Sequence, residues 1–134
     1  MPSPYSILFV CRHNSMRSQI AEVLANKISR GAVLAQSAGP EPTAVPEFIQ
    51  AWANNLTDAA IDLSSNSLDE VKDKAFDLII TLCDKTHQAL PELPSDHDHI
   101  RWDFQHADTE EDLRHLEIEL AERLRLLFLT KKVI

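Results

Sequence analysis

Hydrophobic and polar positions along this chain follow two alternating patterns. Continuous apolar runs occupy residues 5–10 and 76–82, and weaker ones occupy residues 32–36 and 99–102. Such runs are typical of buried strands, which are apolar on both sides. Between the runs lie segments in which apolar residues recur every three or four positions, the spacing of a helix with one buried side. The pattern therefore predicts strands that alternate with helices.

Helices are expected in three places. The first begins at Ser18 and ends at Gly31, and the second begins near Pro46. The last follows Asp108, which we expect to be its N-cap because Glu111 stands three residues later. A helix with one apolar side must bury that side against another layer. The apolar side of the last helix is expected to consist of Leu113, Leu116, Leu120, Leu124 and Leu127.

Alternating strands and helices indicate an α/β fold, a three-layer sandwich in which helices cover both faces of a parallel sheet. The chain length fits a single domain over residues 1–134. Ligands of such folds bind beyond the carboxyl ends of the strands. The features expected at those ends are the loop at Cys11, Ser37, Cys83 and the stretch "WDFQHAD" from Trp102. We expect them to gather in one site.

The chain is acidic, with a formal net charge of -8. Such a charge disfavours binding to nucleic acid or to anionic membranes, so any anion site must be local. The start, "MPSPYSILFVCRHN", lacks the segments of a secretion signal, and no stretch approaches the roughly 18 apolar residues of a membrane span. We therefore expect a cytoplasmic protein. Its two cysteines, Cys11 and Cys83, should stay reduced unless their role is redox chemistry.

The stretch "VCRHNSMRS", residues 10–18, joins the first expected strand to the first expected helix. A loop of this kind directs backbone N–H groups at one point, and the helix N-terminus adds partial positive charge there. Both features stabilise a thiolate at Cys11. Arg17 can bind a tetrahedral oxyanion through two parallel hydrogen bonds, Ser18 can donate to the sulfur, and Asn14 can brace the loop. The stretch therefore predicts a nucleophilic cysteine at an oxyanion site.

The segment "VCRHNSMRSQIAE" resembles the nucleophile loop of the low-molecular-weight protein tyrosine phosphatase superfamily, and more closely that of its arsenate reductase branch. The likeness continues through "SAG" at 37–39, "IDLSS" at 61–65, "DLIITLC" at 77–83 and the region of Trp102. It thus covers nearly the whole chain in order. The resemblance implies a four-stranded parallel sheet of the phosphotyrosine phosphatase I-like type, with the flavodoxin-like strand order 2-1-3-4.

By this resemblance Cys11 is the nucleophile and Ser18 assists its sulfur. The oxyanion would be bound by Arg12, His13, Asn14, Ser15, Met16 and Arg17. The family loop usually has glycine in place of His13 and a second cysteine in place of Met16, but neither position supplies the nucleophile. Arsenate reductases of this type can also hold a potassium ion near the loop. The matching positions are Asn14, Glu22, Ser37 and Asp69.

The second cysteine, Cys83, matches the resolving cysteine of the arsenate reductase branch. There, the nucleophile attacks arsenate, and the resolving thiol then attacks the adduct, which releases arsenite and leaves a disulfide. Thioredoxin-coupled members carry a third cysteine seven residues further on, where this chain has Leu90. A three-thiol relay is therefore not expected. The two cysteines present fit either a two-thiol version or one that uses glutathione with glutaredoxin, or another small thiol, as the electron donor.

The proton donor of the phosphatases is an aspartate in a stretch that resembles W-x-F-x-D-P. This chain has His106 at the aspartate position and Ala107 at the proline position. His106 can donate a proton near neutral pH, and Asp103 and Asp108 flank it as alternatives. The departure weakens the phosphatase hypothesis most, because a phenolate needs a proton to leave, whereas arsenate loses only hydroxide or water.

The sequence therefore favours a cysteine-nucleophile enzyme that reduces arsenate to arsenite, with Cys11 attacking and Cys83 resolving. No cofactor is required; arsenate reduction would use an external thiol, and the resemblance implies that a potassium ion can be held near the loop. One alternative is a phosphatase that hydrolyses phosphotyrosine or another aryl phosphate through a phosphocysteine on Cys11. Another is a regulatory module that binds phosphate or arsenate without turnover. Oligomeric state does not follow from the sequence.

Overall fold

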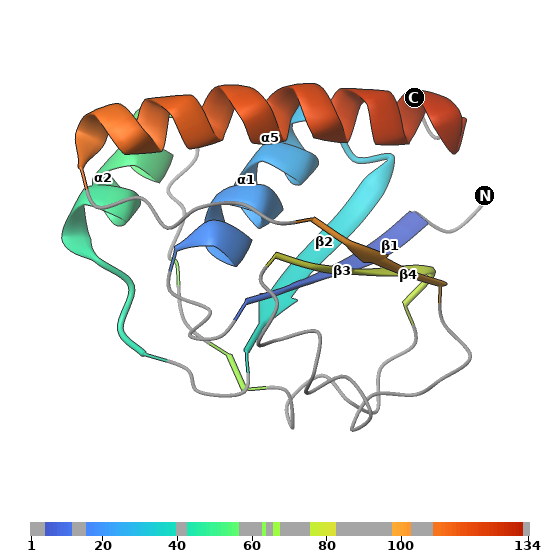
Figure 1. Ribbon diagram of the computed structural model, residues 1–134, viewed down its shortest axis with the longest axis horizontal. Coiled ribbons are helices and arrows are strands. Elements are labelled where there is room, and N and C mark those ends of the chain that lie inside the picture. Colours follow the sequence, from blue (N-terminus) through green and yellow to red (C-terminus); the bar gives the residue numbers. More distant parts are fainter. Residues whose placement is uncertain are drawn as a thin grey trace.

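The computed structural model describes residues 5–11, 16–39, 43–56, 63, 66–67, 76–82, 98–102 and 109–132. Strands and helices alternate along the chain, as Figure 1 shows. The elements, in chain order, are β1 (Tyr5–Val10), α1 (Arg17–Ser29), β2 (Val33–Ala38), α2 (Glu47–Leu56), β3 (Leu78–Thr81), β4 (Asp98–Arg101) and α5 (Glu110–Thr130).

The strands form one sheet in the order β2-β1-β3-β4, and every pairing is parallel. Val10, the last residue of β1, pairs with Ala38 on one side and with Thr81 on the other. Thr81 in turn pairs with Arg101 of β4. All four strands thus end at the same edge of the sheet. The predicted α/β fold with a parallel sheet is confirmed.

Successive residues of β1 point to opposite faces of the sheet. Ile7 and Phe9 belong to a large apolar cluster that also contains residues of α1, α2 and α5. Leu8 and Val10 belong to a second buried cluster, with Ala38, Phe76 and Ile79. Helices α1 and α5 pack together on the side of the first cluster (Figure 1). The three helices that the sequence predicts, α1, α2 and α5, all contribute to the first cluster, and among the described residues no helix contributes to the second. The expected covering of both faces by helices is therefore seen for one face only in the described part of the chain.

Helix α1 begins at Arg17, one residue before the predicted start. Its N-cap, Met16, makes no side-chain capping hydrogen bond. The helix ends at Ser29; its C-cap, Arg30, has a left-handed φ of 51°, and Gly31 follows with a φ of 95°. Glycine adopts that conformation at little cost, which explains why the helix stops close to the predicted residue.

Helix α5 corrects the predicted N-cap. The cap is Thr109 and not Asp108: Thr109 has extended backbone angles, and its hydroxyl accepts a hydrogen bond of 3.1 Å from the N–H of Asp112. This bond satisfies one of the helix's first N–H groups. The five predicted core leucines of α5 are all buried, and Phe128 joins them. No helix in the described part of the chain is long and apolar enough to cross a membrane.

Candidate active site

Cys11 lies where β1 passes toward the first turn of α1. Its N–H donates to the carbonyl of Ala38 at 3.3 Å, so the backbone is still tied to β2 at this point. The side chain is 3% exposed and belongs to the apolar cluster under α1, on the same side of the strand as Phe9. Its Sγ lies 3.0 Å from Oγ of Ser18, which is fully buried. The expected pairing of sulfur and hydroxyl is therefore present in the fold.

The start of α1 offers an electrostatic environment suited to an anion. The first turn, which the structure describes in full, has no acidic residue, and Met16 provides no side-chain acceptor for the helix N–H groups. The helix dipole places partial positive charge at such an end. The side chain of Met16 is buried in the core, so any contribution of this residue to anion binding would come from its backbone. The remaining loop residues, 12–15, lie outside the described part of the chain.

Arg17 connects the start of α1 to the end of β3. Its Nη1 donates to the carbonyl of Leu82 in a long contact of 3.5 Å. Leu82 is held beside β1, because its N–H donates to the carbonyl of Val10 at 2.9 Å. The guanidinium is therefore directed at the edge of the sheet where Cys11 lies. Leu82 immediately precedes Cys83, which is itself outside the described residues.

The end of β4 reaches the same edge of the sheet. The N–H of Trp102 donates to the carbonyl of Thr81 at 2.8 Å, and its indole is 7% exposed. The guanidinium carbon of Arg123, from α5, lies 5.7 Å from the centre of the indole, within the range of a cation–π interaction. Trp102 thus holds the last described residue before the gap at the carboxyl edge of the sheet. The three candidate proton donors, Asp103, His106 and Asp108, lie outside the described residues.

Glu22 and Ser37, two of the four expected potassium ligands, lie side by side. Oγ of Ser37 donates to Oε1 of Glu22 at 3.2 Å. Burial raises the pKa of Glu22 to about 7, although hydrogen bonds from the side chain and backbone of Ser37 oppose the rise. The hydroxyl oxygen of Ser37 and the partly buried carboxylate of Glu22 are ligands that fit a hard cation, which would compensate the charge of the carboxylate. Asn14 and Asp69, the other expected ligands, lie outside the described residues.

Asn66 is a residue of this region that the sequence did not single out. Its Nδ2 donates to the carbonyl of Ser37 at 3.2 Å, and its own carbonyl accepts from the N–H of Gly39 at 3.0 Å. Asn66 therefore holds the end of β2, and with it the hydroxyl that faces Glu22. Its place directly after "IDLSS" was the one available signal. Among the described side chains, no group of three or more His, Cys, Asp and Glu residues is arranged to hold a metal.

Comparisons with known proteins agree on the family. Residues 6–120 match the family described as low molecular weight phosphotyrosine protein phosphatase. An arsenate reductase of Brevibacillus brevis is 33% identical over 109 residues, which are 78% of this chain and 78% of that protein. The crystal structure of an arsenate reductase from Archaeoglobus fulgidus is similar with a TM-score of 0.74 at 30% identity, covering 90% of this chain and 97% of the other.

A low molecular weight protein tyrosine phosphatase from T. tengcongensis has a TM-score of 0.81 at 20% identity, covering 94% of this chain and 99% of the other. This likeness concerns the fold alone. The fold therefore carries proteins named for either reaction, and both names denote enzymes. The chain belongs to the low molecular weight phosphotyrosine protein phosphatase family of enzymes, and within that family it is related to the arsenate reductases.

Proposed function

We propose that this protein is a thiol-dependent arsenate reductase in which Cys11 attacks arsenate and Cys83 resolves the adduct. The observation that supports this most is the contact between Arg17 and the carbonyl of Leu82. The strand that leads into Cys83 lies beside the strand that leads into Cys11, because Leu82 is bonded to Val10. The named relatives at 30% identity or more support the same reaction.

In the binding step, the arsenate oxygens are held by the guanidinium of Arg17 and by the backbone N–H groups of residues 12–17. A planar guanidinium matches two oxygens of a tetrahedral anion, and the start of α1 favours negative charge. Ser18, whose hydroxyl is 3.0 Å from the sulfur, donates to Cys11 while the sulfur is a thiolate. The buried hydroxyl thus keeps the nucleophile oriented toward the bound anion.

The chemistry then proceeds in two steps. The Cys11 thiolate forms a bond to As(V), and one arsenate oxygen leaves as water after it takes up protons. The Cys83 thiolate next attacks the sulfur of Cys11, the S–As bond breaks, and its electron pair stays on arsenic, which becomes As(III). The products are arsenite and a Cys11–Cys83 disulfide. An external thiol returns two electrons to the disulfide. Since Leu90 replaces the third cysteine, we propose glutathione with glutaredoxin, or another small thiol, as the donor.

A phosphatase is the second candidate, and the contact between Cys11 and Ser18 favours it as well. A hydroxyl that donates to the sulfur stabilises the thiolate that leaves when water cleaves a phosphocysteine. In this reaction His106, Asp103 or Asp108 would protonate the phenolate of phosphotyrosine or another aryl phosphate. Cys83 would have no part in it.

We propose further that Asn14, Glu22, Ser37 and Asp69 hold a potassium ion. The potassium ion would supply a fixed positive charge near the oxyanion loop. The residues of this chain contribute oxygen ligands, and the hydrogen bond from Ser37 keeps the carboxylate of Glu22 in place. Asn66 secures the backbone of Ser37.

Paired assays test the two reactions. Arsenate reduction is measured with glutathione and glutaredoxin, and aryl phosphate hydrolysis is measured between about pH 5 and 7. We expect arsenate turnover that Cys83→Ser and Cys11→Ser both abolish. Hydrolysis that survives Cys83→Ser but not Cys11→Ser, without arsenate turnover, would replace this proposal with the phosphatase. Binding of phosphate or arsenate with neither turnover would identify a regulatory module.

A further inference from the structure

Strand β2 lies at an edge of the sheet: in the described part of the chain, β1 is the one strand that pairs with it. In a strand the N–H and C=O groups of one residue point to the same side, and successive residues alternate between the two sides. The carbonyl of Ala38 accepts from Cys11, so the even-numbered residues of β2 face β1. The odd-numbered residues, Val33, Ala35 and Ser37, therefore direct their N–H and C=O groups out of the sheet. Such groups are a template on which another chain can pair.

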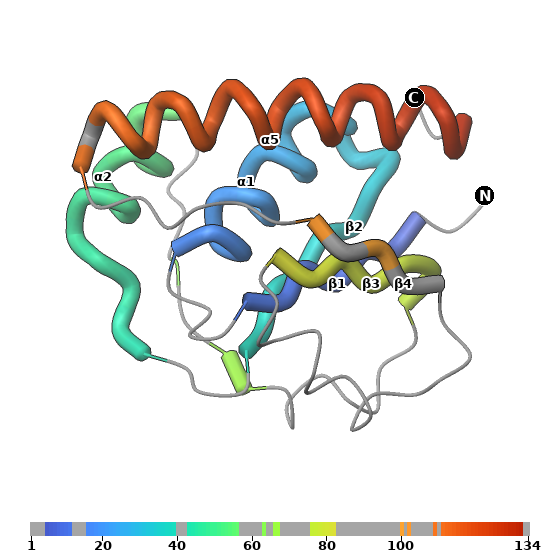
Figure 2. Tube along the Cα trace, viewed as in Figure 1, coloured from blue at the N-terminus to red at the C-terminus, as the bar shows by residue number. Residues whose placement is uncertain are grey.

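Side chains of α1 bond to these outward groups. Helix α1 leads directly into β2, which runs back alongside it (Figure 2). Oγ of Ser29 accepts from the N–H of Val33 at 3.1 Å and donates to its carbonyl in a longer contact of 3.5 Å. Oδ1 of Asn26 accepts from the N–H of Ala35 at 3.0 Å, and its Nδ2 donates to the carbonyl of Ala35 at 3.4 Å. Each side chain thus takes both backbone groups that a neighbouring strand would use.

The third outward residue, Ser37, is bonded as well. Its N–H and its hydroxyl donate to the carboxylate of Glu22, and its carbonyl accepts from Asn66 at 3.2 Å. Glu22, Asn26 and Ser29 are spaced by four and three residues, so they follow one side of α1. We call these three residues the polar row of α1. Every outward N–H and C=O group of β2 therefore has a partner.

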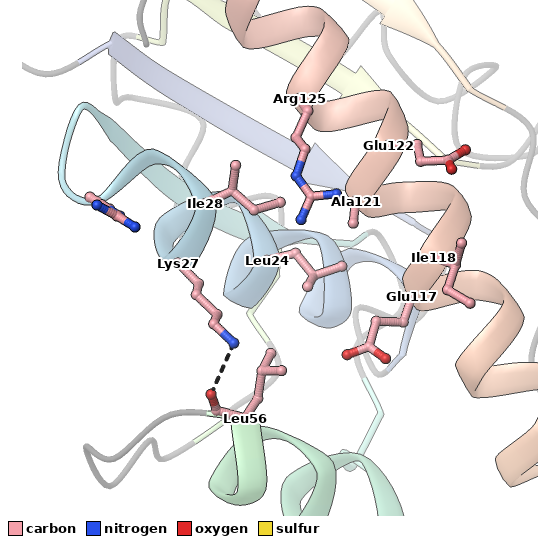
Figure 3. A pocket seen from close by; sticks show the side chains of 10 residues that line it. Leu24, Lys27, Ile28, Leu56, Glu117, Ile118, Ala121, Glu122 and Arg125 are labelled. Atoms are coloured by element: carbon pink, nitrogen blue, oxygen red, sulfur yellow. Dashed lines mark hydrogen bonds between the residues drawn. The ribbon is translucent and has the colours of Figure 1, made fainter.

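The contacts of α1 with the other helices lie on its opposite side. At about 100° per residue, Leu24 and Ile28 lie across the helix from Asn26. They line a groove of about 650 Å³ between α1, α5 and the end of α2, where Lys27 donates to the carbonyl of Leu56 (Figure 3). Helix packing therefore does not account for the polar row. Asparagine is also a weaker helix former than alanine, so its presence in α1 calls for a reason outside the helix itself.

We propose that the polar row closes the edge of β2, and that without it this edge would pair with an extended segment of a partly unfolded second copy of the chain. Leu34, which lies between the residues bonded to Asn26 and Ser29, is 52% exposed. Its side chain would pack against an apolar residue of the added segment, on the same face of the enlarged sheet. The proposal is independent of the proposed function.

The occupant is an extended segment and not a folded copy. Helix α1 lies along the β2 edge, so two folded copies that joined their β2 edges about a two-fold axis would bring their α1 helices together on one face of the sheet. The apolar runs at 5–10 and 76–82 are largely buried in the folded chain. They become available for pairing when a copy unfolds, which is when an open edge would capture them.

Hydrogen exchange and aggregation test the proposal in Asn26→Ala, Ser29→Ala and the double variant. In the folded monomer, Asn26→Ala should raise the exchange rate of the Ala35 N–H at least about tenfold, because its acceptor is lost. In urea that unfolds each protein to the same small fraction, light scattering measures aggregation at about 50 μM. We expect the double variant to aggregate at least about tenfold faster than the parent chain. In its aggregates the N–H groups of Val33 and Ala35 should be protected again.

Thr109→Ala is the matched control, because it removes one hydrogen bond from the start of α5 and leaves the β2 edge closed. At an equal unfolded fraction we expect it to aggregate like the parent chain. Circular dichroism checks that each variant is folded, and Asn26→Ala alone gives the same comparison if the double variant does not fold. Edge variants that aggregate no faster than Thr109→Ala would contradict the proposal. So would aggregates in which the Ala35 N–H exchanges freely, or unchanged exchange of this group in Asn26→Ala.

Discussion

Helix α1 begins without a side-chain cap and without an acidic residue in its first turn, whereas α5 begins at Thr109, whose hydroxyl accepts from Asp112. The first N–H groups of every helix need acceptors. In α5 the chain supplies one itself, and in α1 it places a cysteine, a serine and an arginine there instead. Helix α5 thus satisfies one of its own first N–H groups, whereas the start of α1 lacks a side-chain cap, as expected if it binds the oxyanion that we propose.

Substitution of the proposed nucleophile, Cys11, is expected to have the largest effect at the start of α1. Cys11→Ser removes the thiolate but keeps a side chain of similar size, so we expect activity toward arsenate and toward aryl phosphate to fall at least about a thousandfold. Phosphate binding should persist, because the guanidinium and the helix start are unchanged. Kinetics and phosphate titration measure the two quantities. Loss of binding together with activity would mean that the sulfur itself organises the site.

Arg17→Lys keeps the positive charge and removes the planar pair of donors. We expect kcat/KM to fall about a hundredfold, because a lysine cannot donate two parallel hydrogen bonds to one oxyanion. Arg125→Lys, an exposed arginine on α5, is the matched control and should retain full activity. Equal rates for Arg17→Lys and the parent chain would show that only the charge matters.

Ser18→Ala removes the hydroxyl 3.0 Å from the sulfur of Cys11. We expect kcat to fall roughly tenfold while KM changes little, since a single hydrogen bond to the sulfur contributes about 1 to 3 kcal/mol. An unchanged kcat would assign Ser18 to packing alone.

Glu22, the acidic residue of α1, gives a prediction about pH. Burial raises its pKa from the ordinary 4.5 to about 7, so the folded state binds the proton more tightly than the unfolded state. The stability that this group contributes is present below about pH 4.5 and is lost as the pH rises to about 7, by at most roughly 3 kcal/mol.

Urea unfolding at pH 5 and pH 8, with sodium as the only added cation, measures this loss. Glu22→Gln should lack it, because an amide does not titrate. Potassium should raise the stability of the parent chain at pH 8, but not that of Glu22→Gln. The same pH dependence in both chains would assign the loss to other groups, and an equal effect of sodium and potassium would argue against the potassium site.

Thr109→Ala, at the start of α5, is expected to have the smallest effect, and the effect is on stability alone. We expect a loss of about 1 kcal/mol in the free energy of unfolding, because the bond to Asp112 disappears. Activity should be unchanged, in contrast to Ser18→Ala. Urea unfolding and the arsenate assay measure both quantities. A loss of activity in Thr109→Ala would show that α5 and the site are coupled.

The sequence predicted those elements whose pattern of apolar residues is contained in one short segment. The apolar run of β3 and the leucine repeat of α5 depend on neighbouring residues, and both elements form where they were expected. The N-cap of α5 was wrong by one residue, because both Asp108 and Thr109 are good caps and the backbone decides between them. The sequence could not choose between Asp108 and Thr109, because the side chains of both residue types can accept a hydrogen bond from the first turn of a helix.

Tertiary contacts were harder to predict. The contact of Arg17 with Leu82 depends on the register between β1 and β3, which no short segment encodes. Asn66 holds Ser37 across 29 positions of sequence, for the same reason. The pairing of Cys11 with Ser18 could be predicted, because a loop and one helical turn join them.

Mass spectrometry of the reduced protein, incubated with arsenate and no external thiol, shows whether arsenate drives a disulfide between Cys11 and Cys83. We expect a loss of two hydrogens that depends on arsenate, and a peptide in which a disulfide joins Cys11 to Cys83. Phosphate in place of arsenate should leave both thiols intact, and Cys83→Ser should not form the linked peptide. A protein that keeps both thiols after exposure to arsenate would contradict the proposed resolving role of Cys83.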